Sequence, residues 1–294
     1  MTVYTAREMD VYYISYDEPN CEDNWSNVQN IVPWAKRVHG VKGFEAAHKA
    51  CANDSATPRF LTIDGDNWLH TNHGSDSILD IKLDDTGMED VVFSFKSRNS
   101  INGLEYGNGG LKCWNKNTLL ASNTHESSDS TDFCWALRYY QVDVLGSTSV
   151  NNATPFQAWR AGFREGVKMS YINGEPMTDP RAQMHQIPRT NLSKLHVWMT
   201  VGRDSINGAW AMLGARQGFC ELYSGTISNT VINDYDWFGE RWKRVAHCNL
   251  ESALSQHNRR LSDEFDLYIP ELDQLTSQWF KKIYMNPPRR GMML

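Results

Sequence analysis

The chain has 294 residues, of which 40% are hydrophobic and 22% are charged, a composition typical of a globular protein rather than of a disordered or fibrous one. No stretch approaches the roughly 18 consecutive apolar residues that span a bilayer, and the first residues lack the apolar core of a signal peptide. The six cysteines form no C-x-x-C pair, which disfavours a zinc knuckle and indicates free thiols in a reducing compartment. We therefore expect a cytoplasmic protein with no membrane contact and no obligate protein partner.

Charge is distributed unevenly along the chain. Residues 1–150 contain 12 Lys and Arg against 21 Asp and Glu, a net charge of −9. Residues 151–294 contain 17 against 14, a net charge of +3, and the two halves sum to the −6 of the whole chain. An acidic half suits a bound metal ion, and a basic half suits a polyanionic partner. Chance scatter of surface charge is the alternative.

The first 67 residues alternate between strand and helix patterns. Residues 10–16, 35–39 and 59–63 predict strands, the first and third because they are rich in β-branched and aromatic residues. Residues 23–32 and 43–52 predict helices. This β-α-β-α-β order indicates parallel strands joined by right-handed crossovers, in an α/β fold with a mixed sheet flanked by helices.

The third predicted strand ends in two carboxylates, Asp64 and Asp66, separated only by Gly65. In open α/β sheets, ligands bind where such strands end. Two carboxylates at this spacing suit a hard divalent cation, Mn²⁺ or Mg²⁺, that is also held by a diphosphate. The alternative is an Asp-Gly turn that closes a β-hairpin.

The chain contains neither G-x-G-x-x-G nor G-x-x-x-x-G-K-[ST], which disfavours a dinucleotide dehydrogenase and a P-loop NTPase. A metal ion on Asp64 and Asp66 would neutralise phosphates instead. The base and ribose of a nucleotide would then lie across the ends of the first strands, where we expect Asp17, His39 and Lys42.

A glycine-rich stretch over residues 96–114 is the second informative segment. Its glycines allow a backbone to approach a ligand closely, and its amides and lysine suit sugar hydroxyls and a phosphate. Trp114 offers a stacking plane. We expect these residues near the sugar and pyrophosphate of a donor: Asn102, Tyr106, Asn108, Gly109, Gly110 and Lys112. A glycine-rich hairpin is the alternative.

A serine-rich loop over residues 122–132 holds the richest acid and base cluster after Asp64. One of Glu126, Asp129 and Asp132 would serve as a general base that deprotonates an acceptor hydroxyl. His125 would complete a metal shell. The alternative is a solvated loop with no chemical task.

A helix is predicted to begin at Thr154 and Pro155, an N-cap followed by proline in the first turn. It places Arg160, Arg164 and Lys168 on one face, a basic stripe that could bind the phosphates of an acceptor. A solvated helix face is the alternative.

The composition changes near residue 191, and we place a domain boundary there. Residues 1–190 would form the catalytic domain, and residues 191–294 a helical region that binds the acceptor and packs on the first. Helices are predicted over residues 195–201, 209–222 and 245–261. Tryptophans interleaved with basic residues fit nucleic-acid binding, and amphipathic core helices fit equally well.

The β-α-β-α-β start, the apolar strand ending in Asp-x-Asp and the lack of a phosphate loop resemble the nucleotide-sugar glycosyltransferases of the GT-A fold, over roughly residues 8–170. The resemblance implies a Rossmann-like sheet, with Asp64 and Asp66 as metal ligands on the donor diphosphate and Asp17 near the nucleoside. The strings WAKRVHGVKGFEAAHKA, IDGDN, INGLEYGNGGLKCW and FQAWRAGFREGVKM are also similar to glycosyltransferases of tailed bacteriophages, which modify 5-hydroxymethylpyrimidines in DNA.

Two departures from that family leave roles open. The Glu-Asp pair that marks the base of many inverting relatives is missing in that form, so Glu126, Asp129 and Asp132 compete for the role. Three histidines compete for the place of a third metal ligand, namely His125, His196 and His247.

These patterns lead to a metal-dependent glycosyltransferase that moves a sugar from a nucleotide diphosphate donor, a UDP-sugar, to a hydroxyl of modified DNA such as 5-hydroxymethylcytosine. It would act in the host cytoplasm if a phage encodes it. Three alternatives stay open: a protein or glycan acceptor, a non-enzymatic binding protein on a GT-A-like scaffold, and a metal-dependent nuclease or nucleotidyltransferase.

Overall fold

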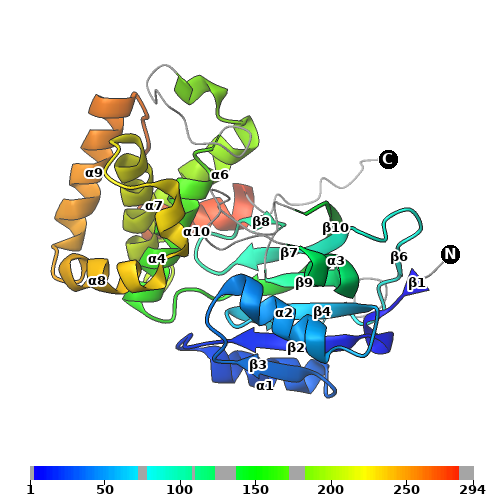
Figure 1. The fold of residues 1–294 in the computed structure, drawn as a ribbon. Helices are drawn as coiled ribbons and strands as arrows, with labels where there is room; N and C mark the ends of the chain where they lie inside the picture. The colour runs from blue at the N-terminus through cyan, green and yellow to red at the C-terminus, as the bar shows by residue number, and fades with distance from the viewer. Residues whose placement is uncertain (1–2, 72–77, 108–109, 123–136, 172–182, 285–294) are drawn as a thin grey trace, which may run out of the picture. The chain divides into compact units, whose positions relative to one another are not determined.

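The computed structural model describes residues 3–71, 78–107, 110–122, 137–171 and 183–284 (Figure 1). The backbone divides into two compact units. Unit 1 comprises Met1–Asn99 and Glu105–Val150, and unit 2 comprises Ser100–Leu104 and Asn151–Leu294. Unit 1 holds the sheet, drawn in blue to green in Figure 1, and unit 2 is built from helices, drawn in green to orange.

Unit 1 begins with the predicted β-α-β-α-β order. The elements are β2 (Asp10–Ser15), α1 (Cys21–Ile31), β3 (Lys36–His39), α2 (Phe44–Asp54) and β4 (Arg59–Asp64). β2 pairs in parallel with β3 on one side and with β4 on the other. The prediction is therefore confirmed, with element bounds that shift by only one or two residues.

Later segments extend the sheet on the far side of β4. They are β5 (Asn67–Leu69), β7 (Val92–Asn99), β8 (Glu105–Tyr106), β9 (Leu111–Asn115) and β10 (Tyr139–Ser149). The strand order is β3-β2-β4-β9-β7-β10-β5, with β8 paired to β7. β9 is antiparallel to both β4 and β7, whereas β10 is parallel to β7. The predicted α/β fold with a mixed sheet and flanking helices is confirmed.

Two short strands, β1 (Val3–Tyr4) and β6 (Leu83–Asp84), pair with each other outside this sheet. Residues 78–82, which precede β6, form no strand. Ile78 is buried nonetheless. Apolar side chains in this segment therefore fill the core, although the segment does not pair with another strand. Their spacing alone resembles that of a strand.

Apolar side chains cover both faces of the sheet, because alternate residues of a strand point to opposite sides. Tyr13 and Ile63 belong to the core on one face, whereas Tyr12 and Phe60 belong to the core on the other. Trp114 lies in this second core, fully buried, and its indole N–H donates to the hydroxyl of Thr62 over 2.7 Å. The expectation that Trp114 offers a stacking plane to a ligand is therefore wrong.

The short helix α3 (Lys116–Ala121) belongs to unit 1, whereas unit 2 contains the helices that follow β10, from α4 onward (Figure 1). They are α4 (Pro155–Lys168), η4 (Met184–Gln186), α6 (Arg189–Thr200), α7 (Gly208–Tyr223), η5 (Asn229–Asn233), α8 (Tyr235–Val245), α9 (Leu250–Phe265), α10 (Gln274–Trp279) and η6 (Phe280–Tyr284). The predicted N-cap is confirmed, since the Thr154 hydroxyl accepts from Gln157 N over 3.1 Å. The helix predicted over residues 245–261 is confirmed as α9, which begins five residues later than predicted. α8 ends at Val245, and a new N-cap, Asn249, starts α9.

Glycines bring α4 and α7 into close contact. A Cβ on Gly162 or Gly166 of α4 would collide with the carbonyls of Ala211 and Ala215 on α7. Gly214 and Gly218 of α7 face α4 in the same way. Small residues at four-residue spacing let two helix backbones approach each other. α4 is therefore part of the helical unit, and the boundary predicted between residues 190 and 191 lies inside unit 2.

In the described part of the chain, none of the helices combines the length and the apolar composition needed to span a membrane.

Candidate functional site at the carboxyl end of the parallel strands

Asp64, Gly65 and Asp66 lie where β4 ends at the edge of the sheet. In the register of the parallel strands, Asp64 pairs with Ile14, and the next residue of β2, Ser15, pairs with His39 at the end of β3. These strand ends therefore share one edge, as expected for a ligand site in an open α/β sheet. Asp64 and Asp66 are half-buried.

The hairpin alternative for this motif is contradicted by the strand order. β5 begins directly after Asp66, but it pairs antiparallel with β10 and not with β4. At Asp64-Gly65-Asp66 the chain thus changes its pairing partners, from β2 and β9 beside β4 to β10 beside β5. The motif marks a change of position within the sheet rather than a tight turn between partner strands.

Three hydrogen bonds hold the backbone of this crossing. The Gly65 carbonyl accepts from the Tyr13 hydroxyl over 2.7 Å and from the Asn24 side-chain amide over 2.9 Å. The Asp66 carbonyl accepts from Val150 N over 2.6 Å. Tyr13 and Asn24 are both buried, so the backbone between the two acids is fixed by groups shielded from water.

A buried polar network orients the second acid. The Asn67 side-chain amide donates to Asp66 Oδ1 over 2.7 Å, and Asn67 Oδ1 accepts from the Ser147 hydroxyl over 2.7 Å. Ser147 also contacts Ser97, whose hydroxyl lies 2.9 Å from that of Ser149. Outer partners of this kind fix the direction of a metal-binding carboxylate. Sequence analysis missed them, although Asn67 directly follows the motif.

Glu18 is a third carboxylate at the same place, and sequence analysis named only its neighbour Asp17. Glu18 Oε2 lies 2.7 Å from the position that a Cβ on Gly65 would occupy, and it accepts from Tyr16 N over 2.8 Å. Burial raises the pKa of the Glu18 carboxyl, and the charges of Asp66 and Asp64 raise the pKa further. The carboxylates of Glu18, Asp64 and Asp66 are close enough for their charges to repel one another, and a nearby cation would relieve that repulsion.

Part of the glycine-rich stretch does meet this site. Asp64 N donates to the Gly110 carbonyl over 2.7 Å, and a Cβ on Gly110 would lie 2.5 Å from the Cβ of Asp64. Lys112 follows on β9, opposite Thr62, and is almost fully buried. Tyr106 is half-buried on β8. Asn108 and Gly109 lie outside the described residues.

The predicted nucleoside contacts lie at the ends of β2 and β3 or just beyond them. His39 is exposed, and its Nδ1 lies 3.0 Å from the Ser15 hydroxyl. Lys42 is exposed in the loop before α2, and Asp17 is exposed in the loop after β2. Their strands place them on the edge that carries Asp64.

Other predicted site residues belong to unit 2 or lie outside the described residues. Asn102 belongs to unit 2, is fully buried and accepts from Leu104 N over 3.1 Å. It closes a turn, so its interpretation as a sugar contact is corrected to a structural role. His196 lies on α6 and His247 between α8 and α9, both in unit 2. His125, Glu126, Asp129 and Asp132 lie outside the described residues.

The basic stripe on α4 exists in unit 2. Arg160, Arg164 and Lys168 are half-buried, one turn apart. The Arg160 guanidinium lies 4.8 Å from the centre of the Tyr235 ring, and that of Arg164 lies 6.0 Å from it. The Tyr235 ring thus packs against both guanidinium groups and restrains their orientation.

The carboxylates near Gly65 suit one of two kinds of metal site. Among the described residues, no group of three or more His, Cys, Asp and Glu side chains is arranged as a ready metal cage. Mg²⁺ is usually held by one or two carboxylates together with substrate phosphates and water, rather than by protein groups on all sides. Asp64 and Asp66, with Glu18 adding charge, fit that second kind of site.

Comparison of the sequence with protein-family models and with curated proteins finds no match.

Proposed function

We propose that this chain is a metal-dependent glycosyltransferase of the GT-A type that uses a nucleotide diphosphate sugar, with a UDP-sugar as the expected donor. The observation that carries the proposal is the position of Asp64 and Asp66 at the carboxyl end of the central parallel strands, held by buried hydrogen bonds and joined by Glu18. The β-α-β-α-β order and the sheet edge that presents His39 support a nucleotide site beside them.

Each residue of the edge has a task in this proposal. Asp64 and Asp66 would hold Mn²⁺ or Mg²⁺, which when bound stabilises the negative charge of the departing diphosphate. Asp17, His39 and Lys42 would line the nucleoside site. Gly110 lets the donor approach the backbone next to Asp64, and Lys112 adds a positive charge on the neighbouring strand. The general base is proposed among Glu126, Asp129 and Asp132.

The proposed acceptor is modified DNA, such as duplexes that carry 5-hydroxymethylcytosine. The ordered guanidinium groups of Arg160 and Arg164 support it, because arginines recognise phosphates with paired hydrogen bonds. A base inside a duplex would have to be flipped out to reach the site. The net charge of −6 favours a second candidate acceptor, a protein or a glycan.

Nucleoside mass spectrometry tests the transfer. Hydroxymethylated DNA is incubated with the protein, Mn²⁺ and a panel of nucleotide sugars, then digested to nucleosides. We expect the mass of one nucleoside to rise by one sugar residue with one donor, and no change with the Asp64→Asn, Asp66→Asn double variant. If no donor gives a mass shift, DNA is excluded as the acceptor. Hydrolysis of the donor without transfer would direct the search to protein and glycan acceptors.

A further inference from the structure

An exposed apolar stripe runs along the last described helix. α10 continues directly into the π-helical turn η6, and three large apolar side chains follow one another at four-residue spacing. Leu275 is 74% exposed, Trp279 is 60% exposed and Ile283 is 39% exposed. Contiguous apolar side chains on one exposed helix face mark an interaction surface, unlike single scattered ones.

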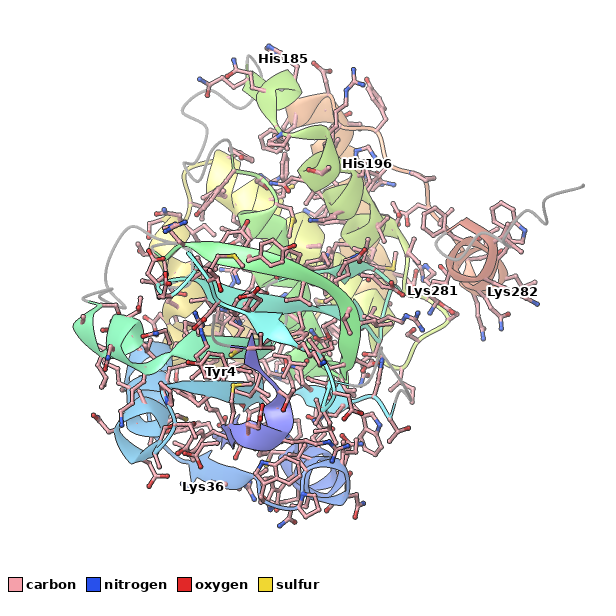
Figure 2. The ribbon with its side chains drawn as sticks, turned by 90° about the vertical axis from the view of Figure 1, so that its right-hand side faces the viewer. Tyr4, Lys36, His185, His196, Lys281 and Lys282 are labelled. Atoms are coloured by element: carbon pink, nitrogen blue, oxygen red, sulfur yellow. The ribbon has the colours of Figure 1, made fainter. Side chains whose placement is uncertain are left out.

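The opposite face of this helix attaches to unit 2 through polar groups. The Lys281 ammonium lies 2.6 Å from the Asp204 carboxylate, and it donates to the Ser205 hydroxyl over 2.9 Å and to the Ile101 carbonyl over 3.0 Å. Ser277 is fully buried on the same side. Figure 2 shows Lys281 and Lys282 leaving the helix in different directions. The helix is thus anchored by its polar side and presents its apolar side outward, the reverse of an ordinary surface helix.

We propose that this stripe, Leu275-Trp279-Ile283, pairs with the same stripe of a second copy of the chain. The pattern is symmetric about Trp279, with one aliphatic side chain four residues before it and one four residues after it. A two-fold axis through Trp279 would align the helices antiparallel and place Leu275 against Ile283 of the second copy. Self-complementarity of this kind is what a two-fold interface requires.

Charge agrees with the antiparallel arrangement. Asp273 stands at the first end of α10, where its carboxylate caps Thr276 N over 2.7 Å, and the exposed Lys282 stands near the other end. Antiparallel pairing brings Lys282 of one copy toward Asp273 of the other and keeps the two Lys282 side chains apart. Three side chains per copy bury less area than a permanent dimer needs, so the dimer should dissociate on dilution.

Analytical ultracentrifugation of the full chain over a hundredfold concentration range tests the pairing. We expect a reversible monomer–dimer equilibrium that Trp279→Glu shifts at least tenfold toward monomer. Tyr268→Glu serves as the matched control, because Tyr268 is also 74% exposed but lies outside the stripe. A monomer at every concentration overturns the proposal, as does a dimer that Trp279→Glu leaves unchanged. Sedimentation of the monomer with anionic lipid vesicles would assign the stripe to a membrane surface instead.

Disulfide cross-linking tests the antiparallel alignment of the two helices and leaves Trp279 unchanged. In a background with Cys134 and Cys248 changed to serine, an equal mixture of Leu275→Cys and Ile283→Cys proteins should form a disulfide-linked dimer under mild oxidation. Each variant by itself should form at least tenfold less, because two copies of residue 275 would lie about 12 Å apart along the helix axis. Efficient self-cross-linking of Leu275→Cys overturns the antiparallel arrangement.

Discussion

The side-chain amide of Asn67 donates a hydrogen bond to the carboxylate of Asp66 over 2.7 Å, and its own oxygen is held by a buried serine. Through Asn67, the half-buried carboxylate of Asp66 at the sheet edge is linked by hydrogen bonds to a buried serine of the interior. The Asp66 carboxylate is therefore held in one orientation, because Asn67 cannot turn away from it without leaving buried hydroxyls unpaired.

Asn67→Ala should weaken both the fold and the site. The Ser147 and Ser97 hydroxyls lose a buried partner, at a cost of about 1–3 kcal/mol in the free energy of unfolding. The affinity for Mn²⁺ should fall about 10-fold to 100-fold, as happens when an outer partner of a metal ligand is lost. Urea denaturation and calorimetric Mn²⁺ titration measure the two effects. Trp68→Ala, a change at the neighbouring, 44% exposed side chain, should reduce metal affinity much less.

Gly110→Ala should destabilise unit 1 and disturb Asp64. Its Cβ would lie 2.5 Å from the Asp64 Cβ, which cannot move without moving β4, so we expect a loss of about 1–3 kcal/mol. Gly239→Ala is the matched control within a helix, since nothing lies within 4 Å of the added Cβ. That control should stabilise α8 by roughly 0.5–1 kcal/mol. Thermal unfolding of both variants gives the comparison, and equal melting temperatures would contradict the predicted close approach at Gly110.

Stability should fall below neutral pH because of His257. Burial, together with the positive charges of Arg260 and Arg216, lowers the pKa of His257 to about 4, while the charge of Glu264 opposes them. Above pH 6.5 the imidazole is neutral in both the folded and the unfolded chain. It therefore does not make the free energy of unfolding depend on pH in that range. Between about pH 6.5 and 4 only the unfolded chain binds the proton. Folding then loses up to about 1.4 kcal/mol per pH unit.

The His257→Gln variant checks that slope. It removes the titrating group, so its free energy of unfolding should vary less between pH 6.5 and 4 than that of the wild type. Urea titrations at four pH values within this window give the difference. Parallel curves for the two proteins would show that His257 titrates alike in both states.

Acceptor binding should depend steeply on salt if the acceptor is DNA. Each phosphate contact contributes about 0.9 to the slope of log K against log salt concentration. The double variant Arg160→Gln, Arg164→Gln should therefore reduce the slope by up to about two, whereas Lys243→Gln on α8 should change it by less than one. Fluorescence anisotropy with a labelled hydroxymethylated duplex measures the slope. A flat salt response in the wild type favours a protein or glycan acceptor.

Local patterns predicted the first 64 residues well because alternating strands and helices lead to neighbouring parallel strands, here in the order β3-β2-β4. The later strands could not be ordered, since β9 inserts between β4 and β7 from a distant segment. The same limit applies to the site. Asp64 and Asp66 can be recognised in the sequence as a motif, but Asn67 is oriented by Ser147, which lies 80 residues further along the chain.

Unit 2 shows a signal that sequence analysis could have used. Gly162 and Gly166 on α4, and Gly214 and Gly218 on α7, have the four-residue spacing of a close helix crossing. Recognising this pair would have placed α4 with the later helices. Trp279 differs. The sequence pattern is compatible with a buried tryptophan at this position, and only the structure shows that its side chain is exposed.

Calorimetric titration with UDP, in the presence and absence of Mn²⁺, tests the central claim that Asp64 and Asp66 form a metal and diphosphate site. We predict that UDP binds the wild type only with Mn²⁺ and that the Asp64→Asn, Asp66→Asn double variant loses at least tenfold in affinity. Asp143→Asn should bind like the wild type, because the Asp143 side chain is 88% exposed on β10. Absence of UDP binding to the wild type, or equal binding to the double variant, would contradict the account.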